Sequence, residues 1–300
     1  MNLIKEMKKN WALMFMFLLP LLWYITFCYV PMYGIQIAFR NFNPAKGYLG
    51  STWVGFEQFR RFFSSYYSIQ VIKNTVLLSL YSVIFGFPVP ILLALMINEI
   101  KSTRYKKVVQ NITYIPHFLS VVVVCGMLYL FLSPQYGVVN NFLLFLKIDP
   151  IAFMESEKYF RGVFIISGIW QTAGWSSIIY IAALAGISPT LYEAATIDGA
   201  SRFRKMKHVS IPGIAPTIIT LLILRIGQLM SVGFEKALLL QNDLNLGTSE
   251  IISTLVYKNG ILQGDFSYAT AVGLMNSIIN LVLIILANKI SRKFSENSLW

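Results

Sequence analysis

Long apolar runs alternate with short polar segments along the chain, and each run is about as long as a membrane-crossing helix. A spanning helix needs about 20 mostly apolar residues. Six runs reach that length, near 11–35, 71–98, 110–132, 162–186, 211–233 and 267–289. We therefore predict an all-α integral membrane protein with six transmembrane helices.

The composition supports this class. Hydrophobic residues make up 56% of the 300 and charged residues 13%, whereas soluble domains carry about 25% charged residues. The first run is longer than the roughly 7–15 apolar residues of a signal peptide, and no small-residue cleavage site follows it. We expect this first run to be retained as a span.

Charged residues are distributed unevenly between the segments that connect the runs. With the N-terminus in the cytoplasm, cytoplasmic segments hold fourteen Lys and Arg against five acids, and the opposite side holds ten against eight. This is the positive-inside bias of membrane proteins, and it predicts that both termini are cytoplasmic. The bias also explains the net charge of +12, so we expect no nucleic-acid partner.

Residues suited to covalent chemistry or metal binding are scattered. Cys28 and Cys125 both lie within apolar runs, and His117 and His208 are far apart in sequence. No G-x-x-x-x-G-K-[ST] phosphate loop, H-E-x-x-H or G-x-S-x-G motif occurs. We therefore expect no catalytic residue, no metal site and no cofactor bound by this chain.

Two local patterns predict further features. Pro88 and Pro90 should interrupt the second span, because proline lacks the N–H that the helix needs. Phe56, Phe59 and Phe63 recur at helical spacing and favour an amphipathic helix at the outer membrane surface. The alternative is a structural belt of interfacial aromatic side chains.

The segment between the fourth and fifth runs has the signals of a cytoplasmic helix-turn-helix. Ser188 followed by Pro189 is a favoured start for a helix. Gly199 supplies the left-handed residue that ends it. Ser201 can then cap a second short helix, and Pro212 is predicted to restart the chain as the fifth span.

Residues 188–210 also carry features of a docking element. Ala194 and Ala195 allow another backbone to approach closely, and Glu193 and Asp198 can form ion pairs at the rim. The residues expected to face inward on the second helix are Phe203, Met206 and Val209. An alternative is a basic helix held on anionic lipid, which would not explain the alanines or the acids.

The pattern E-A-A, three residues, G, nine residues and I-x-L-P marks the permease subunits of binding-protein-dependent ABC importers, and this sequence resembles that family. The matching residues are Glu193, Ala194, Ala195, Gly199 and Pro212, with Val209 and Ile211 as conservative replacements. Four short segments resemble those of maltose-type carbohydrate permeases, in particular the permeases that import alginate or pectin fragments. These segments are Asn74-Thr75, 114–120, 226–228 and 232–235.

The resemblance implies a permease in a bacterial cytoplasmic (inner) membrane that forms half of a pathway for an oligo- or polysaccharide. A second permease subunit, related but different, would complete the pathway, and an extracellular or periplasmic solute-binding protein would deliver the carbohydrate. Two ATP-binding subunits would hold ATP and Mg. The residues that would couple them to transport are Glu193, Ala194, Ala195, Asp198, Gly199 and Pro212.

The sequence shows no linker, low-complexity tract or strong internal repeat, so we predict a single membrane domain. A basic cytoplasmic segment, 1–10, precedes a single transmembrane permease domain, 11–290, which contains the coupling loop 188–210. Residues 291–300 form a cytoplasmic tail.

Polar side chains within three spans are candidates for lining the pathway. They are Gln171 and Trp175 in the fourth, Arg225 and Gln228 in the fifth, and Gly273, Asn276 and Asn280 in the sixth. Arg225 falls near the middle of its run, where a cation needs a partner or a wet cavity, and Gln228 follows on nearly the same helical face. An arginine there would suit an acidic sugar such as a uronate. The alternative is that these groups bridge helices.

Rival functions remain open at the level of sequence. A stand-alone secondary transporter usually shows an inverted repeat, broken helices or an intramembrane carboxylate, and none of these is evident. A membrane enzyme would need a nucleophile, a base or a metal cluster. An ABC permease for a non-carbohydrate solute is a third alternative.

Overall fold

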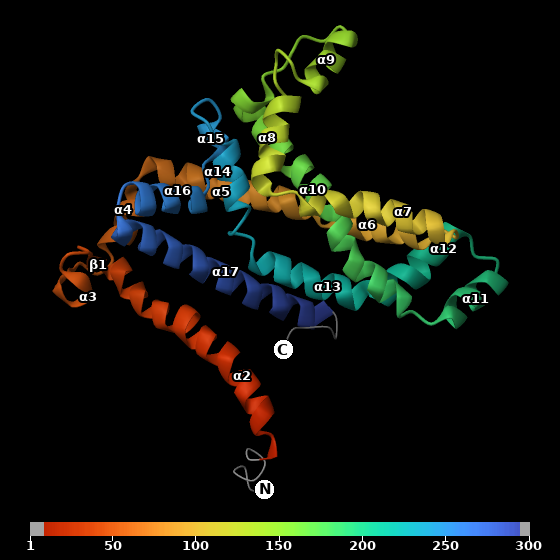
Figure 1. Ribbon diagram of the computed structural model, residues 1–300, viewed down its shortest axis with the longest axis horizontal. Coiled ribbons are helices and arrows are strands. Elements are labelled where there is room, and N and C mark those ends of the chain that lie inside the picture. The colour runs from red at the N-terminus through yellow and green to blue at the C-terminus, as the bar shows by residue number, and fades with distance from the viewer. Residues whose placement is uncertain (1–8, 295–300) are drawn as a thin grey trace. The chain divides into compact units, whose positions relative to one another are not determined.

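The computed structural model describes residues 9–294, with side chains as far as Arg292. The regular structure of these residues is helical apart from one two-stranded sheet (Figure 1). The chain divides into two compact units. The first comprises the residues up to Ser65 together with Val256–Met275, and the second comprises Tyr66–Leu255 together with the residues from Asn276.

The first unit begins with a long apolar helix whose winding changes along its length. This helix consists of α2 (Trp11–Tyr24), a π turn (Ile25–Tyr29) and a 3₁₀ helix (Val30–Phe39). The other elements of the unit are β1 (Arg40–Asn41), α3 (Gly47–Gly50), β2 (Thr52–Trp53), α4 (Glu57–Ser64), a second π turn (Lys258–Leu262) and the start of α17 (Phe266–Phe294). The two strands are antiparallel and pair Arg40 with Trp53.

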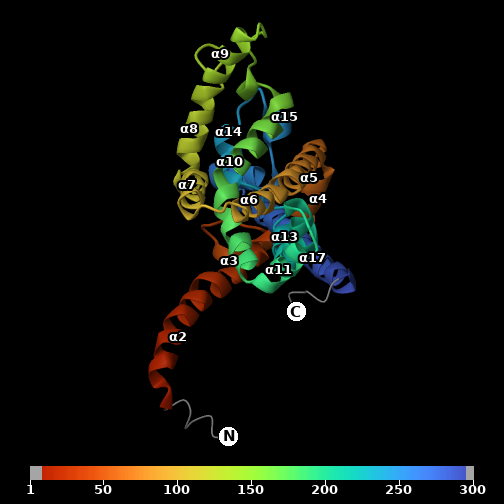
Figure 2. The same cartoon turned by 90° about the vertical axis from the view of Figure 1, so that its right-hand side faces the viewer.

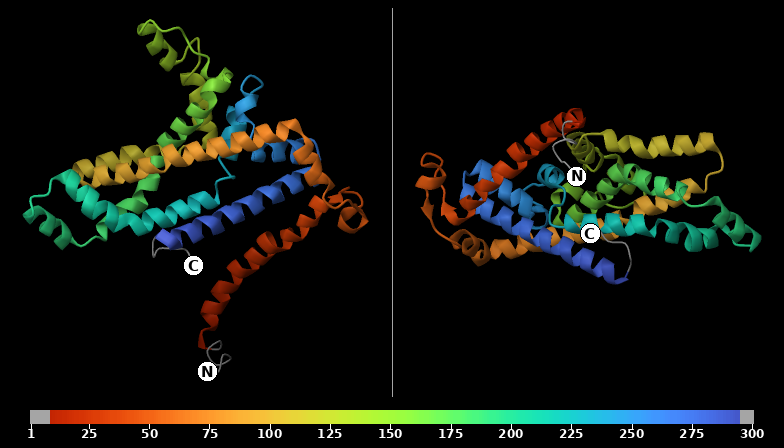
Figure 3. Two further views of the ribbon diagram at one scale, coloured as in Figure 1. Left: turned by 180° about the vertical axis from the view of Figure 1, so that it is seen from behind. Right: turned by 90° about the horizontal axis from the view of Figure 1, so that it is seen from below.

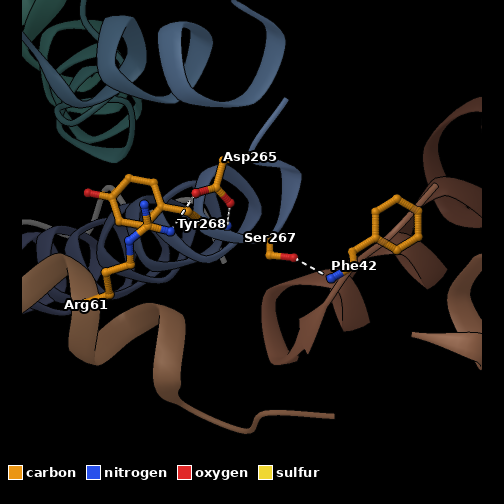
Figure 4. A network of polar contacts seen from close by, with 5 residues as sticks. All are labelled: Phe42, Arg61, Asp265, Ser267 and Tyr268. Atoms are coloured by element: carbon orange, nitrogen blue, oxygen red, sulfur yellow. Dashed lines mark hydrogen bonds and ion pairs between the residues drawn. The ribbon is translucent and has the colours of Figure 1, made fainter. Parts of the chain in front are cut away.

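Polar contacts fasten β1 and α4 to the start of α17 (Figure 4). Arg61 forms an ion pair with Asp265 (Nη1–Oδ2 2.6 Å), and its guanidinium lies 4.7 Å from the centre of the Tyr268 ring. Asp265 also accepts the Tyr268 N–H (3.1 Å) and so caps α17. The Phe42 N–H donates to the Ser267 hydroxyl (2.8 Å), which joins positions 225 residues apart.

The predicted amphipathic helix is confirmed as α4. Phe59 and Phe63 lie on this helix and Phe56 directly precedes it, while Phe62 is the ring that becomes buried. Phe56 and Phe63 stay exposed. Their place at a membrane surface stays a prediction.

The second unit holds the other helices. They are α5 (Tyr66–Gly86), α6 (Pro88–Asn98), α7 (Thr103–Tyr114), α8 (Val121–Phe131), α9 (Val138–Phe145), α10 (Glu157–Ala185), α11 (Pro189–Ile197), α12 (Arg202–Lys205), α13 (Ile211–Gly227), α14 (Phe234–Leu240), α15 (Leu246–Ser249) and the start of α16 (Ile252–Tyr257), with 3₁₀ turns at Ile115–Phe118 and Phe153–Glu155 and a π turn at Met206–Ser210. Helix α10 is central, because it packs against α5, α6, α7 and α13 (Figure 3).

The all-α membrane class is confirmed. Among the described residues, five helices are long and apolar enough to cross a membrane, namely Trp11–Phe39, Tyr66–Asn98, Glu157–Ala185, Arg202–Gly227 and Phe266–Arg292. The predicted interruption of the second of these is also confirmed, since α5 ends at Gly86 and α6 begins at Pro88.

The third predicted span, near 110–132, is a broken one. It consists of Thr103–Phe118 and Val121–Phe131, whose axes differ by 97°. Pro116 lacks the N–H that would continue the first helix, and the Ser120 hydroxyl accepts the Val123 N–H (3.3 Å) to start the second. The interpretation that no span is broken is therefore wrong.

The predicted restart of the chain at Pro212 is also wrong. One continuous helix runs from Arg202 to Gly227. Its π turn, Met206–Ser210, shifts the hydrogen bonds so that the Ile211 N–H reaches the Met206 carbonyl, and the following proline is accommodated without a break. This helix ends at Gly227, before the predicted limit of the fifth span.

Asn74 and Thr75 form one of the segments that resemble the family, and they hold the region of α15 and α16 against α5. Asn74 Nδ2 donates to the carbonyls of Gly247 (2.9 Å) and Glu250 (3.1 Å), and the Thr75 hydroxyl accepts the Ile252 N–H (2.9 Å). Both side chains are buried. Their role in this structure is to anchor a returning segment.

Candidate functional site

Residues 188–210 form the predicted helix-turn-helix, called the hairpin below. The cap of its second helix is confirmed, because the Ser201 hydroxyl accepts the Arg204 N–H (3.4 Å). The predicted cap by Ser188 is wrong. No side-chain hydrogen bond caps α11, because the Ser188 hydroxyl bonds the nearby Thr190 hydroxyl instead (2.7 Å).

Gly199 makes the turn, as predicted. Its φ is +71°, a conformation that costs a residue with a Cβ about 1–2 kcal/mol. The Ala200 N–H donates to the Ala195 carbonyl (2.9 Å) and the Gly199 N–H to the Thr196 carbonyl (3.1 Å), which closes the end of α11. A Cβ at position 199 would meet nothing within 4 Å, so only the backbone angle requires glycine.

Side-chain contacts tie the two arms of the hairpin together. The hydroxyls of Tyr192 and Ser210 lie 3.0 Å apart and hydrogen-bond. Lys205 Nζ donates to the Thr196 hydroxyl (2.9 Å). These contacts hold α11 at a fixed place beside the start of the long helix Arg202–Gly227.

The hairpin presents an exposed surface. Helix α11 has no buried residue, and Glu193, Ala194 and Asp198 are all exposed. Ile197 is 87% exposed and Phe203 is 75% exposed. The expectation that Phe203 faces inward is therefore wrong, because none of the described residues covers its side chain.

A small pocket brings together two of the predicted pathway residues. Its lining residues are Ser79, Ser82, Val83, Arg225, Gln228, Leu229, Ser231, Val232 and Gly233. Ser79 is buried, and its hydroxyl has no hydrogen-bond partner. The pocket therefore combines a guanidinium, an amide and several hydroxyls, which are groups that bind carboxylates and sugar hydroxyls.

The helical placement predicted for Arg225 and Gln228 needs correction. Arg225 lies in the last turn of α13 rather than near the middle of a span, and Gln228 lies just beyond that helix. The chain turns after Gly227, so Gln228 does not belong to the helix that carries Arg225. Both residues line the pocket.

Gln171 and Trp175 contact the break in the third span. Gln171 is buried, and its Nε2 donates to the Leu119 carbonyl (2.9 Å), a group left free by the break. The Trp175 ring stacks on His117, with centres 4.6 Å apart. These contacts support the alternative of helix bridging for both residues.

The polar residues of the sixth span differ from one another. Asn280 accepts the Met230 N–H (3.0 Å) and donates to the Ser231 hydroxyl (2.9 Å), so it orders the turn that lines the pocket. Asn276 has a buried Oδ1 with no hydrogen-bond partner. Asn280 is thus placed to support the pocket.

A family model for the inner membrane component of binding-protein-dependent transport systems matches residues 71–296. The chain belongs to this family. The family predicted from the E-A-A pattern is confirmed, and the chain is a multi-pass permease, a transport subunit of the inner membrane. Membership also decides against the stand-alone secondary transporter, despite the broken span.

Two Bacillus subtilis (strain 168) proteins are similar to this permease over almost its whole length. The polygalacturonan/rhamnogalacturonan transport system permease protein YteP is 42% identical over 99% of this chain and 92% of that protein. Protein LplB is 40% identical over 96% of this chain and 91% of that protein.

Crystal structures of alginate transporters share the fold. A chain of a bacterial ABC transporter involved in import of the acidic polysaccharide alginate has a TM-score of 0.91 and 43% identity, covering 98% of this chain and 99% of that chain. A chain of a bacterial alginate ABC transporter in complex with an alginate pentasaccharide-bound periplasmic protein has a TM-score of 0.92 and 42% identity over the whole of both chains.

Lys236 is a polar residue of the permease that the sequence did not reveal. It is buried in α14, donates from Nζ to the Phe164 carbonyl (2.9 Å) and lies over the Phe164 ring. Burial lowers the pKa of Lys236 to about 8, opposed by the nearby Cys125 thiol. A lysine in a short helix that follows a span resembles an ordinary loop residue, so no sequence signal marked it.

Proposed function

We propose that this permease forms half of the translocation pathway of an ATP-driven importer and couples that pathway to two ATP-binding subunits through the hairpin. The observation that carries the proposal is the rigid, exposed hairpin closed by Gly199. A rigid element transmits motion, whereas a flexible loop would absorb it. ATP and Mg belong to the ATP-binding subunits, and the hydrolysis takes place there.

The continuous helix Arg202–Gly227 gives the coupling a physical route. It starts in the hairpin and ends beside the pocket, a length of about 39 Å at 1.5 Å per residue. A displacement of the hairpin would therefore be delivered to the turn that carries Gln228 and Ser231. Pro212 lies within this helix and so belongs to the element that would transmit the displacement.

The proposed substrate is an oligo- or polysaccharide with acidic groups. Relatives named for alginate and polygalacturonan transport support this class, because both are acidic polymers. Arg225 in the pocket supports it independently, since guanidinium groups pair well with carboxylates. Gln228 and the pocket serines would bind sugar hydroxyls.

The proposed partners follow from the family. A second permease, related but different, would complete the pathway, and a periplasmic or extracellular solute-binding protein would deliver the carbohydrate, as in the alginate transporter complex. Positive-inside charge supports cytoplasmic termini and a cytoplasmic hairpin.

Replacement of Gly199 tests the coupling. In the transporter reconstituted with its partner subunits, we expect Gly199→Val to strain the turn and to lower substrate uptake per ATP hydrolysed about tenfold, since the cost of a non-glycine residue there is about 1–2 kcal/mol. Membrane insertion should be unchanged. The measurement is uptake and hydrolysis in the same vesicles.

Gly264 offers a matched control. Its φ is +73°, and a Cβ there would also meet nothing within 4 Å, but it lies outside the hairpin. Gly264→Val should leave the ratio of uptake to hydrolysis unchanged. Normal coupling in the Gly199 variant, or equal loss in both, would refute the proposed role.

A further inference from the structure

The turn between α13 and α14, residues 228–233, is held in place by a side chain of α17. Figure 2 shows α13 and the later part of α17 next to each other. The Asn280 Oδ1 accepts the Met230 N–H (3.0 Å), and its Nδ2 donates to the Ser231 hydroxyl (2.9 Å). Ser231 lines the pocket, so Asn280 fixes one of the polar groups that a ligand in the pocket would meet.

The same contact determines how the Ser231 hydroxyl can bond. Its oxygen accepts a proton from the Asn280 amide, so its own proton stays available. Within the described part of the chain, no acceptor takes that proton. Ser231 therefore offers the pocket a hydrogen-bond donor.

The other two serines of the pocket differ from each other. The Ser82 hydroxyl donates to the Leu78 carbonyl (2.7 Å), so it offers the pocket only lone pairs. Ser79 is buried, and its hydroxyl has no partner among the described residues, so it can donate. A buried hydroxyl without a partner costs free energy, and a ligand group that accepts its proton would remove that cost.

The donors in the pocket suit a carboxylate. The Arg225 guanidinium is a donor only, and Ser79 and Ser231 add two hydroxyl donors beside it. An ionised carboxylate is an acceptor only, with about four positions for incoming hydrogen bonds. A sugar hydroxyl or a neutral ester can also accept hydrogen bonds, but both lack the negative charge that strengthens each bond.

The size of the pocket limits how much of a ligand it can hold. Its cavity volume is about 60 Å³, whereas sites that enclose a drug-sized ligand measure about 300–1,000 Å³. The pocket therefore admits one substituent of a sugar ring and leaves the rest of the chain of sugars outside.

We propose that Asn280 is a positioning residue that keeps Ser231 as a hydrogen-bond donor to the carboxylate of one sugar residue, and that Ser79 is a second donor to the same group. The inference rests on the proposed function, because it needs the pocket to lie on the substrate pathway. It assigns the preference for a carboxylate over a neutral group to these hydroxyls together with Arg225.

Uptake of a matched pair of sugars tests the proposal. The probes are a galacturonate trimer and its methyl ester, supplied with the same solute-binding protein to the assembled transporter in vesicles. We expect Ser231→Ala to lower the ratio of acid uptake to ester uptake about fivefold, because hydrogen bonds to charged groups are stronger than those to neutral groups. Asn280→Leu, of similar size and without charge, should lower the ratio by a similar factor. The double variant should lose no more than the larger of the two single losses.

Ser82→Ala is the matched control within the pocket. Its hydroxyl proton is already bonded to Leu78, so this variant should change the uptake of both sugars alike and leave the ratio unaltered. A lower ratio in this control, equal to that of Ser231→Ala, would overturn the proposal.

Three further results would also overturn it. These are an unchanged ratio in Ser231→Ala, an equal loss of both sugars in Asn280→Leu, and losses that multiply in the double variant. If Arg225→Ala lowers the ratio while Ser231→Ala does not, the proposed function stands and only this inference fails. If the unmodified transporter takes up neither sugar, or Arg225→Ala leaves the ratio unchanged, the proposed acidic substrate fails as well.

Discussion

At the residue scale, two basic side chains close to the end of the fifth span lie in opposite environments. Lys236 is buried against a helix carbonyl, whereas Arg225 lines a pocket. The first is expected to matter for stability and the second for substrate. Both roles can be tested by single replacements.

The pH dependence of stability tests the burial of Lys236. Its pKa falls from the usual value of 10.5 to about 8 in the folded protein, so the unfolded chain binds more protons between those values. Stability should therefore rise as pH increases from 8 to 10.5. We expect Lys236→Met to lack this part of the rise in thermal unfolding curves measured in detergent.

Lys158 provides the comparison for this experiment, because it is an exposed lysine. Lys158→Met should keep the rise seen in the unmodified protein. Identical pH profiles for the Lys236 variant and the unmodified protein would show that the Lys236 ammonium is not buried.

Replacement of Arg225 tests recognition of an acidic substrate. We expect Arg225→Ala to reduce uptake of a uronate oligosaccharide about tenfold or more, because a hydrogen bond to a charged group contributes about 1.5–3 kcal/mol. ATP hydrolysis and assembly with the partner subunits should persist. Arg225→Lys keeps the charge and should recover part of the uptake. Unaltered transport in the alanine variant would make Arg225 structural.

At the scale of elements, the sequence predicts where helices lie better than how they are broken. The length of the apolar runs located all six candidate spans. The cap by Ser201 and the turn at Gly199 were also predicted correctly. The break between Phe118 and Val121 was missed because apolar residues continue on both sides of it. Pro212 was misread because a π turn, which depends on hydrogen-bond register, precedes it.

The packing of α7 on α10 gives a test at this scale. A Cβ on Gly174 would overlap the Thr113 carbonyl oxygen, so Gly174→Ala should force the two helices apart. Overpacking of this kind costs about 1–3 kcal/mol, and we expect a lower unfolding temperature in detergent.

Gly126 in α8 is the matched control, because a Cβ there would meet nothing within 4 Å. Gly126→Ala should be neutral or should stabilise the helix by about 0.5–1 kcal/mol. Equal stability of the two variants would contradict the close approach at Gly174.

At the scale of the whole molecule, one helix joins the two functional regions. Its first turn belongs to the hairpin and its last turn carries Arg225. The sequence predicted both regions through the E-A-A pattern and an isolated cation, but it did not predict that they share a helix. Which residues meet in the pocket depends on the turn after Gly227, and that turn follows from tertiary contacts such as those of Asn280.

Cross-linking from Ile197 tests whether the hairpin docks on an ATP-binding subunit. With Cys28 and Cys125 replaced, Ile197→Cys carries a photoreactive probe in membranes that contain the whole transporter, and Leu244→Cys serves as the control. We expect a cross-link from position 197 to an ATP-binding subunit that changes with ATP, and none from position 244. A probe at position 197 that captures only lipid, or no protein, would contradict it.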